Sequence, residues 1–261
     1  MVTLGESPAK AIVNRGALRL SIGDLDGAEA LYRDAIEVDP ANPTAHTNLG
    51  YLLALTDRYR EAIAQSEEAI ALEPKRSAPW AHLGMSQLAL GDIEQGLSSL
   101  SRAVRLDPEN HFAWNAMGRV LLALDRPNEA ELAWASAVAV RPDDVDLLVS
   151  LAVALTAQKR TGDALRVLYR ATSVAPDSSR AWCQLGIVSI VNQDYGTASD
   201  ALLNALDLDP KDDSARFHLA MLHVLIGARD EARTALATLV DRKTPVASEA
   251  EALLSRIRDD L

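Results

Sequence analysis

The chain has 261 residues, of which 48% are hydrophobic and only 4% aromatic, and its formal net charge at pH 7 is −11. This charge argues against binding to nucleic acid or to an anionic membrane surface, because no excess of cations is available to displace counterions; a partner with a basic or neutral surface fits better. A single cysteine, Cys183, excludes an intrachain disulfide, and no apolar run approaches the roughly 18 residues that insertion across a membrane requires.

Residues 1–8 precede any periodic pattern and are predicted to form a short N-terminal lead-in. The opening sequence, MVTLGESPAK, has no basic segment followed by an apolar stretch, so it does not resemble a signal peptide. Because one cysteine also permits a reducing compartment, we expect a cytoplasmic protein, unless an export signal has been removed from the chain.

From residue 9 onward the chain repeats itself every 34 residues, and such a period is informative about the whole architecture. Proline recurs at this spacing, at Pro40, Pro74, Pro108, Pro142, Pro176 and Pro210. When residue 9 is counted as position 1, seven repeats tile the chain without an insertion. Their predicted bounds are 9–42, 43–76, 77–110, 111–144, 145–178, 179–212 and 213–245.

Each repeat is predicted to form two helices of about 13 residues. Positions 4, 7, 8 and 11 fall on one side of a first helix, and positions 20, 24 and 27 on one side of a second, because 3.6 residues complete a turn. Glycine or alanine occupies positions 8 and 20 of every repeat, which lets two helix backbones approach closely. Proline at position 32 ends the second helix, and an N-cap of the next first helix commonly follows at position 34. These predicted caps are Asn42, Asn110, Asp144, Ser178 and Asp212.

The residues at fixed positions resemble the tetratricopeptide repeat. The matching features are tryptophan or leucine at position 4, leucine and glycine at positions 7 and 8, alanine at 20 and 27, a large residue at 24 (Tyr32, Trp134 and Leu168) and proline at 32. They cover roughly 235 of the 261 residues. The resemblance implies an all-α fold, a right-handed α-solenoid superhelix of helix-turn-helix units. Trp80, Trp114 and Trp182, all at position 4, are then predicted to pack between helices.

Both ends of the periodic region carry features expected of a solenoid, whose terminal repeats need a polar outer face. In the first repeat, Arg15 and Arg19 replace the apolar residues usual at positions 7 and 11. Residues 246–261 are predicted to form a C-terminal capping helix that covers the last repeat, or alternatively a docking helix for a partner. The apolar side of this helix contains Val246, Ala250, Leu253, Leu254 and Ile257, and the polar side contains Ser248, Glu249, Glu251, Arg256 and Arg258.

The resemblance implies that positions 2, 5, 9 and 12 of the first helices line the concave inner surface of the superhelix. This wall is largely apolar, with Arg119 and Arg180 as isolated cations, and it suits an extended chain or an amphipathic helix. Arg119 would meet a carboxylate of a partner or a nearby Asp or Glu of this chain. The residues predicted to contact a partner are Tyr51, Met85, Asn115, Arg119, Val153, Arg180, Ile187, Phe217 and Met221. The alternative for position 12 and part of position 9, including Leu20, Leu88, Leu122 and Val224, is packing between neighbouring first helices.

Several kinds of functional site are not supported by the sequence. The carboxylate clamp of chaperone-binding relatives would need lysine at position 5, which no repeat has, so binding to an acidic chaperone C-terminus is rejected. The five histidines are scattered, and His218 and His223 are five residues apart, which does not match a metal pair on one helix face. Cys183 is expected to behave as a small buried hydrophobe. We therefore predict no cofactor, no metal and no catalytic residues.

The sequence thus favours a non-enzymatic scaffold or adaptor for protein–protein interaction, which binds a peptide segment or helix of a partner in its concave, largely apolar groove. The alternative is a self-assembling structural scaffold that forms homo-oligomers through groove or terminal-helix contacts. No arrangement of residues in the sequence supports an independent catalytic activity.

Overall fold

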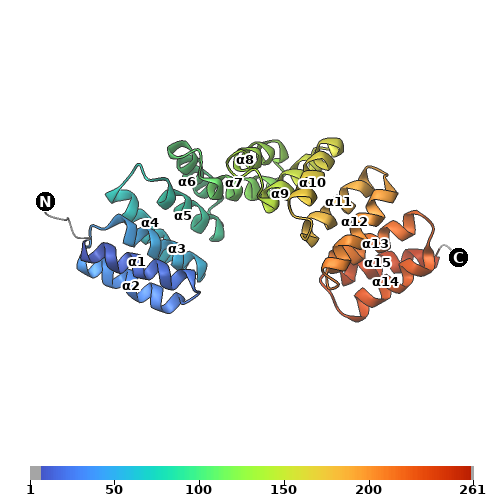
Figure 1. Ribbon diagram of the computed structural model, residues 1–261, viewed down its shortest axis with the longest axis horizontal. Coiled ribbons are helices and arrows are strands. Elements are labelled where there is room, and N and C mark those ends of the chain that lie inside the picture. The colour runs from blue at the N-terminus through green and yellow to red at the C-terminus, as the bar shows by residue number, and fades with distance from the viewer. Residues whose placement is uncertain (1–6, 260–261) are drawn as a thin grey trace. The chain divides into compact units, whose positions relative to one another are not determined.

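The computed structural model describes residues 7–259, and over this range it contains 15 α-helices and no strand (Figure 1). The helices are α1 Pro8–Ser21, α2 Leu25–Val38, α3 Pro43–Leu55, α4 Tyr59–Leu72, α5 Ser77–Ala89, α6 Ile93–Leu106, α7 His111–Ala123, α8 Pro127–Val140, α9 Val145–Ala157, α10 Thr161–Val174, α11 Ser179–Val191, α12 Tyr195–Leu208, α13 Asp213–Leu225, α14 Arg229–Asp241 and α15 Ala247–Asp259. The predicted all-α solenoid class is confirmed.

The helices follow the period seen in the sequence. The odd-numbered helices from α3 to α13 begin 34 residues apart, and each is followed by a second helix after a short turn. These bounds agree with two helices per repeat, while the division into exactly these seven repeats stays a prediction. Residues 1–6 of the predicted lead-in and residues 260–261 of the predicted capping helix lie outside the described range.

The predicted N-caps of the first helices are confirmed. Each cap side chain accepts a hydrogen bond from the backbone N–H three residues later, as a helix N-terminus requires. The five bonds join Asn42 to Ala45 (3.0 Å), Asn110 to Ala113 (3.0 Å), Asp144 to Leu147 (3.3 Å), Ser178 to Ala181 (3.2 Å) and Asp212 to Ala215 (2.9 Å).

The turn between the two helices of each repeat contains one residue in the left-handed region, always at position 15. Glycine supplies this conformation at Gly23, Gly91 and Gly227, with φ of 80°, 88° and 82°. The other four repeats use Asp57, Asp125, Lys159 and Gln193, with φ between 57° and 62°. Since side chains other than glycine adopt this region at a cost, the tertiary packing of the helix pair overrides the local preference at these turns.

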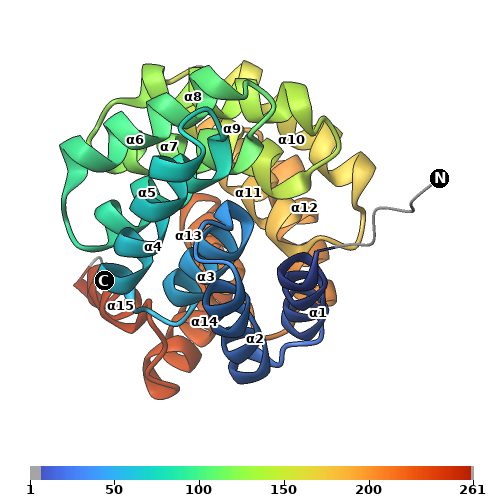
Figure 2. The same cartoon turned by 90° about the vertical axis from the view of Figure 1, so that its left-hand side faces the viewer.

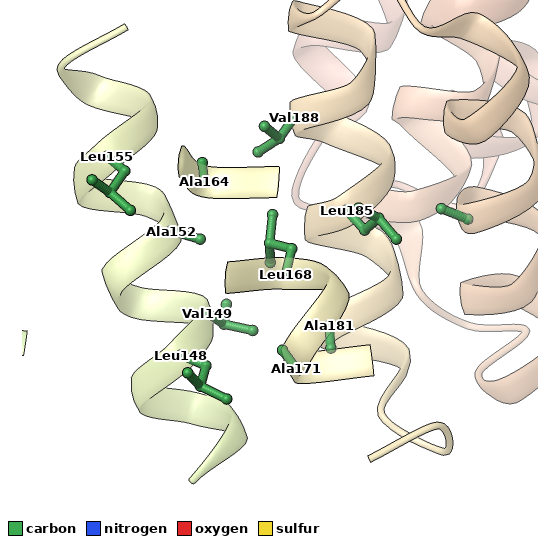
Figure 3. Close-up of a cluster of buried hydrophobic side chains, with 11 residues drawn as sticks. Leu148, Val149, Ala152, Leu155, Ala164, Leu168, Ala171, Ala181, Leu185 and Val188 are labelled. Atoms are coloured by element: carbon green, nitrogen blue, oxygen red, sulfur yellow. The ribbon is translucent and has the colours of Figure 1, made fainter. Parts of the chain in front are cut away.

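Contacts divide the chain into two units, one that ends at Val120 and one that begins at Leu121, so the division falls inside α7. In the first unit the core is built from Tyr32 of α2 and the leucines of α3, with Val13 of α1 beside them. Figure 2 shows α1, α2 and α3 of this unit, drawn in blue. In the second unit, Leu168 of α10 lies between Leu148 of α9 and Leu185 of α11 (Figure 3), and all three are at most 2% exposed.

The tryptophans at position 4 pack against these buried clusters, as predicted. Each indole also donates a hydrogen bond to the carbonyl of the repeating proline six residues earlier, which the sequence reading did not foresee. The bonds are Trp80 to Pro74 (3.0 Å), Trp114 to Pro108 (2.9 Å) and Trp182 to Pro176 (2.8 Å). His46 and Arg216, which replace tryptophan at position 4, bond to Pro40 and Pro210 in the same way.

The outer face of the first repeat is less polar than predicted. Arg15 and Arg19 are exposed as expected, but so are Leu18 of α1, at 64%, and Ile22, which follows the end of α1, at 68%. Position 10 is buried in other repeats, for example at Leu52 (1%), because an earlier repeat packs there. No described helix covers the same side of α1, so Leu18 stays open to solvent. Ile22 lies at position 14, which is exposed in other repeats too, for example at Leu90 (41%).

At the other end, α15 packs against α13 and α14. Ala250 and Ile257 are buried in a cluster with Ala220, Leu236 and Leu239, while Glu249, Glu251 and Arg256 are exposed. These contacts support the capping role, which we retain as a proposal.

Candidate functional site

Within each unit the first helices form one layer and the second helices another. The contacts of α3 run to both α1 and α5, and those of α11 run to both α9 and α13, whereas consecutive second helices make at most marginal contact among the described residues. The layer whose helices lie closer together is the inner side of a curve. Positions 2, 5, 9 and 12 belong to the first helices and therefore to this inner layer, in each unit separately.

In the first unit, Tyr51 of α3 and Met85 of α5 lie in this layer. The Tyr51 ring is 36% exposed and stands against the ring of His82 in α5, with centroids 5.2 Å apart. Met85 is half-buried and packs against the cluster around Leu100. Two adjacent first helices thus present an aromatic and a flexible apolar side chain, each with part of its surface open.

Two further predicted residues lie on α7, in the part that belongs to the first unit. Asn115 is half-buried and is engaged in a contact within the chain. Arg119 is exposed and forms no ion pair with any described residue. Two partners were considered for its guanidinium: a carboxylate of another protein, or a nearby Asp or Glu of this chain. The second is not found among the described residues.

In the second unit, the prediction that Arg180 is an isolated cation is wrong. Its Nη1 lies 2.5 Å from Oδ1 of Asp146, which occupies the same position of the preceding repeat. Both side chains remain largely exposed, at 60% and 74%. The pair forms because equivalent positions of adjacent first helices lie side by side. The 34-residue period already implies this arrangement, but the sequence analysis did not use it to pair the two charges.

The remaining predicted residues of the second unit are half-buried: Val153, Ile187, Phe217 and Met221. Ile187 of α11 and Met221 of α13 pack against one cluster around Leu202 and Leu222, so the structure brings them together. Phe217 packs against a different cluster, that of α13 to α15. The nine predicted residues therefore fall on two units, and they form shared surfaces only within each unit.

The packing alternative holds for part of position 12. Leu20, Leu88 and Val224 pack against buried clusters of their units. Their main role is to join neighbouring helices, and they are poorer candidates for partner contact than Tyr51 or Met221.

Two residues were missed by the sequence reading. Phe112, at position 2 of α7, is 67% exposed and stacks on His111 with centroids 4.1 Å apart. His82, at position 6, was not among the predicted contact residues, yet its ring lies against that of Tyr51. An unusually large residue at a position that is otherwise polar or small was the available signal for Phe112.

The one thiol of the chain, Cys183, lies in this layer at position 5 of its repeat, on α11. Cys183 is 4% exposed, and burial raises the pKa of its thiol to about 11, with Asp212 acting in the same direction. A protonated buried thiol is a poor nucleophile. In residues 7–259, no cluster of histidine, cysteine and acidic side chains is arranged to hold a metal ion. None of the helices described combines the length and apolar content needed to cross a membrane.

Two cavities open on the opposite side, in the layer of second helices. A cavity of about 540 Å³ lies between α12 and α14, and one of about 370 Å³ lies between α8 and α10. None of the nine predicted residues lines either of them.

Comparison with known families and structures gives consistent matches. The model described as the C-terminal domain of cilia and flagella-associated protein 70 matches residues 1–185, and a model described as tetratricopeptide repeat matches residues 192–257. No curated protein sequence matches the chain.

Among solved structures, PilF of Pseudomonas aeruginosa superposes with a TM-score of 0.69 at 18% identity, over 80% of this chain and 95% of that one. A tetratricopeptide repeat protein of Parabacteroides merdae gives 0.65 at 15% identity, over 96% and 98%. YrrB, described as having an unusual peptide-binding site, gives 0.59 at 20% identity, over 70% and 95%. At these identities the likeness concerns the fold.

Proposed function

The chain belongs to the tetratricopeptide repeat family, whose fold supports protein–protein interaction, and we propose that it is a non-enzymatic scaffold that binds a segment of a partner protein on the layer of first helices. The segment is a peptide or a helix that buries its apolar side chains against this layer. The single cysteine fits a reducing compartment, and we propose a cytoplasmic location.

The observation that carries the proposal is the contrast between two sets of side chains on the same helices. Residues at the repeated positions, such as Leu49 and Leu185, are 1% exposed and hold the fold together. Tyr51, Phe217 and Met221, at positions that vary between repeats, keep apolar surface open to solvent. Partly open aromatic and methionine side chains are typical of adaptable binding surfaces.

A pair of tyrosines makes the test specific. Tyr51 on α3 and Tyr169 on α10 are 36% and 49% exposed, but they lie on a first and a second helix. A photo-reactive residue introduced at each site in turn should capture a partner protein from position 51 and not from position 169. With the captured protein purified, Tyr51→Glu and Met85→Asp, in the same unit, should each weaken its binding about tenfold or more, while Tyr169→Glu should not.

Helical circular dichroism of each variant must equal that of the unchanged protein. If capture from position 169 is as efficient, or if Tyr51→Glu and Met85→Asp bind normally, the layer of first helices is not the binding surface.

Self-assembly is the second candidate, and the exposed side of α1 is the observation that favours it. Leu18 and Ile22 leave an uncovered apolar patch at one end of the helix array. Light scattering over a concentration series should then show association that Leu18→Glu with Ile22→Glu abolishes. If the protein stays monomeric at every concentration, self-assembly is excluded, and binding to a different protein remains the proposed function.

A further inference from the structure

Charge in the first unit is divided between its two layers of helices. The first helices α1, α3 and α5, and α7, whose first part belongs to this unit, contain no aspartate or glutamate. Their charged side chains are those of Lys10, Arg15, Arg19 and Arg119. The second helices α2, α4 and α6 carry the carboxylates, which are those of Asp26, Glu29, Asp34, Glu37, Glu61, Glu67, Glu68 and Glu94. The layer of first helices is therefore cationic, within a chain whose net charge is −11.

Distance decides which of these charges a bound segment would meet. An α-helix with its side chains is about 10 Å thick, and charges at the protein surface are screened over about 8 Å at physiological ionic strength. The carboxylates of the second helices are therefore largely screened from a segment that lies on the first helices. The net charge of the whole chain, which favours a basic or neutral partner, does not describe this surface.

Arg119 is the cation that the first unit leaves open on this layer. Among the cations of α1, Arg19 pairs with Asp24 at 3.1 Å, and Lys10 is engaged within the chain. Arg119 on α7 is exposed and forms no ion pair with any described residue. In the second unit, by contrast, Asp146 already pairs with Arg180. An exposed guanidinium with its donors unused is suited to bind a carboxylate through two parallel hydrogen bonds.

Open apolar side chains accompany Arg119 on the same layer. Phe112 precedes it by seven residues, which places the two side chains on one side of α7, about 10 Å apart along the helix. Phe112 is 67% exposed. Met85 occupies in α5 the position that Arg119 occupies in α7, and it packs with Ala116 of α7 against one cluster. Tyr51 occupies this position in α3 and is 36% exposed. One unpaired cation thus lies among partly open aromatic and methionine side chains.

We propose that the first unit binds an acidic segment of a partner protein, in which an aspartate or glutamate lies near an aromatic or other large apolar side chain. The carboxylate pairs with Arg119, and the apolar side chain lies against Phe112 and Met85. Charge complementarity selects this partner, because the layer offers a cation and no competing carboxylate on its helices. The inference rests on the proposed function, and it adds the chemistry of the partner and the unit that recognises it.

The test exposes the full chain to a displayed library of random peptides at physiological ionic strength. We expect the enriched peptides to contain more aspartate and glutamate than the starting library, together with an aromatic or large apolar residue. The most enriched peptide is then synthesised with a fluorophore, and its affinity is measured by fluorescence anisotropy. That affinity should fall several-fold as salt is raised, since an exposed ion pair is screened.

Two pairs of variants locate the contacts of this peptide. Arg119→Glu should lower its affinity tenfold or more, whereas Arg102→Glu, the same charge change at an exposed arginine of α6, should alter it less than twofold. Phe112→Ser should lower the affinity several-fold, whereas Leu132→Ser on α8, where the leucine is 68% exposed, should not. All four replaced side chains are exposed, and helical circular dichroism of each variant must equal that of the unchanged protein.

Enrichment of neutral or basic peptides, or normal binding of the acidic peptide by Arg119→Glu, would overturn the inference. The proposed function would survive that result if a photo-reactive residue at position 51 still captured the enriched peptides. A library that yields no enriched peptide contradicts the inference, and the absence of any capture from position 51 would contradict the proposed function as well.

Discussion

At the scale of single residues, the small side chains at positions 8 and 20 set how closely two helices approach. A Cβ added to Gly84 of α5 would lie 2.8 Å from the carbonyl oxygen of Gly96 and 3.0 Å from the backbone nitrogen of Leu100 in α6. Backbone atoms within a helix cannot move aside cheaply. We expect Gly84→Ala to lower the free energy of unfolding by about 1–3 kcal/mol in urea denaturation followed by circular dichroism.

Gly162 of α10 is the matched control for this substitution. Its added Cβ would meet nothing within 4 Å. Gly162→Ala should therefore raise the free energy of unfolding by about 0.5–1 kcal/mol through helix propensity alone. Equal effects of the two substitutions would contradict the close approach of α5 and α6.

His82 gives the protein a specific response to acid. Burial lowers the pKa of His82 to about 4, although a hydrogen bond with the backbone of Thr47 opposes the shift, and Arg76 lowers it further. Because the unfolded chain binds the proton near pH 6.5, its protonation draws the equilibrium toward unfolding. Stability should fall between pH 6.5 and about 4, by roughly 2–3 kcal/mol in total.

His82→Phe keeps a ring against Tyr51 and removes the titrating group. The variant should lose less stability than the unchanged protein over the same pH interval, as measured by urea denaturation at each pH. Parallel curves for the two proteins would show that His82 is not the group responsible.

At the scale of elements, α15 stabilises the helices that precede it. Ile257 is 4% exposed and packs with Leu236 and Leu239 of α14. Ile257→Ala should cost about 2–4 kcal/mol of unfolding free energy, because it removes buried methyl groups and leaves a cavity. Ser255→Ala, on the exposed side of the same helix, should change stability by less than about 0.5 kcal/mol. A small effect of Ile257→Ala in thermal or urea unfolding would argue instead for a helix that is only loosely attached.

The helices themselves could be predicted because seven similar segments act as an alignment within one chain. Caps such as Asn42 and Asp212, and the packing of Trp80, follow from local chemistry repeated at one spacing. The left-handed turn residues could not be found this way, because Lys159 and Gln193 carry no signal for positive φ and are forced by the packing of the helix pair.

The candidate site was predicted less completely than the helices. The repeat period places equivalent positions of adjacent helices side by side, so the pair between Arg180 and Asp146 was available from spacing alone. The stacking of His82 on Tyr51 was not, because it depends on which way each ring turns.

At the scale of the whole molecule, arginine side chains bridge successive second helices and pair with some of the acidic side chains of a chain whose net charge is −11. Arg58 joins Glu29 of α2 to Glu61 near the start of α4, and Arg160 joins Glu131 of α8 to Asp163 of α10. Hydrogen bonds from Arg58 lower the pKa of Glu61. Such exposed pairs stabilise weakly and lose effect in salt, so the cohesion of each unit rests on its buried clusters.

Because the described helix contacts join only helices one or two places apart in the chain, stability should be distributed along the molecule rather than shared by a single core. Leu49 in the first unit and Leu236 in the second are each at most 1% exposed, in separate clusters. In native-state hydrogen exchange, Leu236→Ala should speed exchange by tenfold or more in α13 to α15 and leave α1 to α4 almost unchanged. Leu49→Ala should do the reverse. Both variants replace a buried leucine by alanine. A difference between them in which helices exchange faster therefore reports on which helices are coupled, and not on how much side chain was removed. Uniform acceleration along the whole chain in either variant would mean that the helices unfold as one cooperative body, although each contacts only helices that are close to it in the chain.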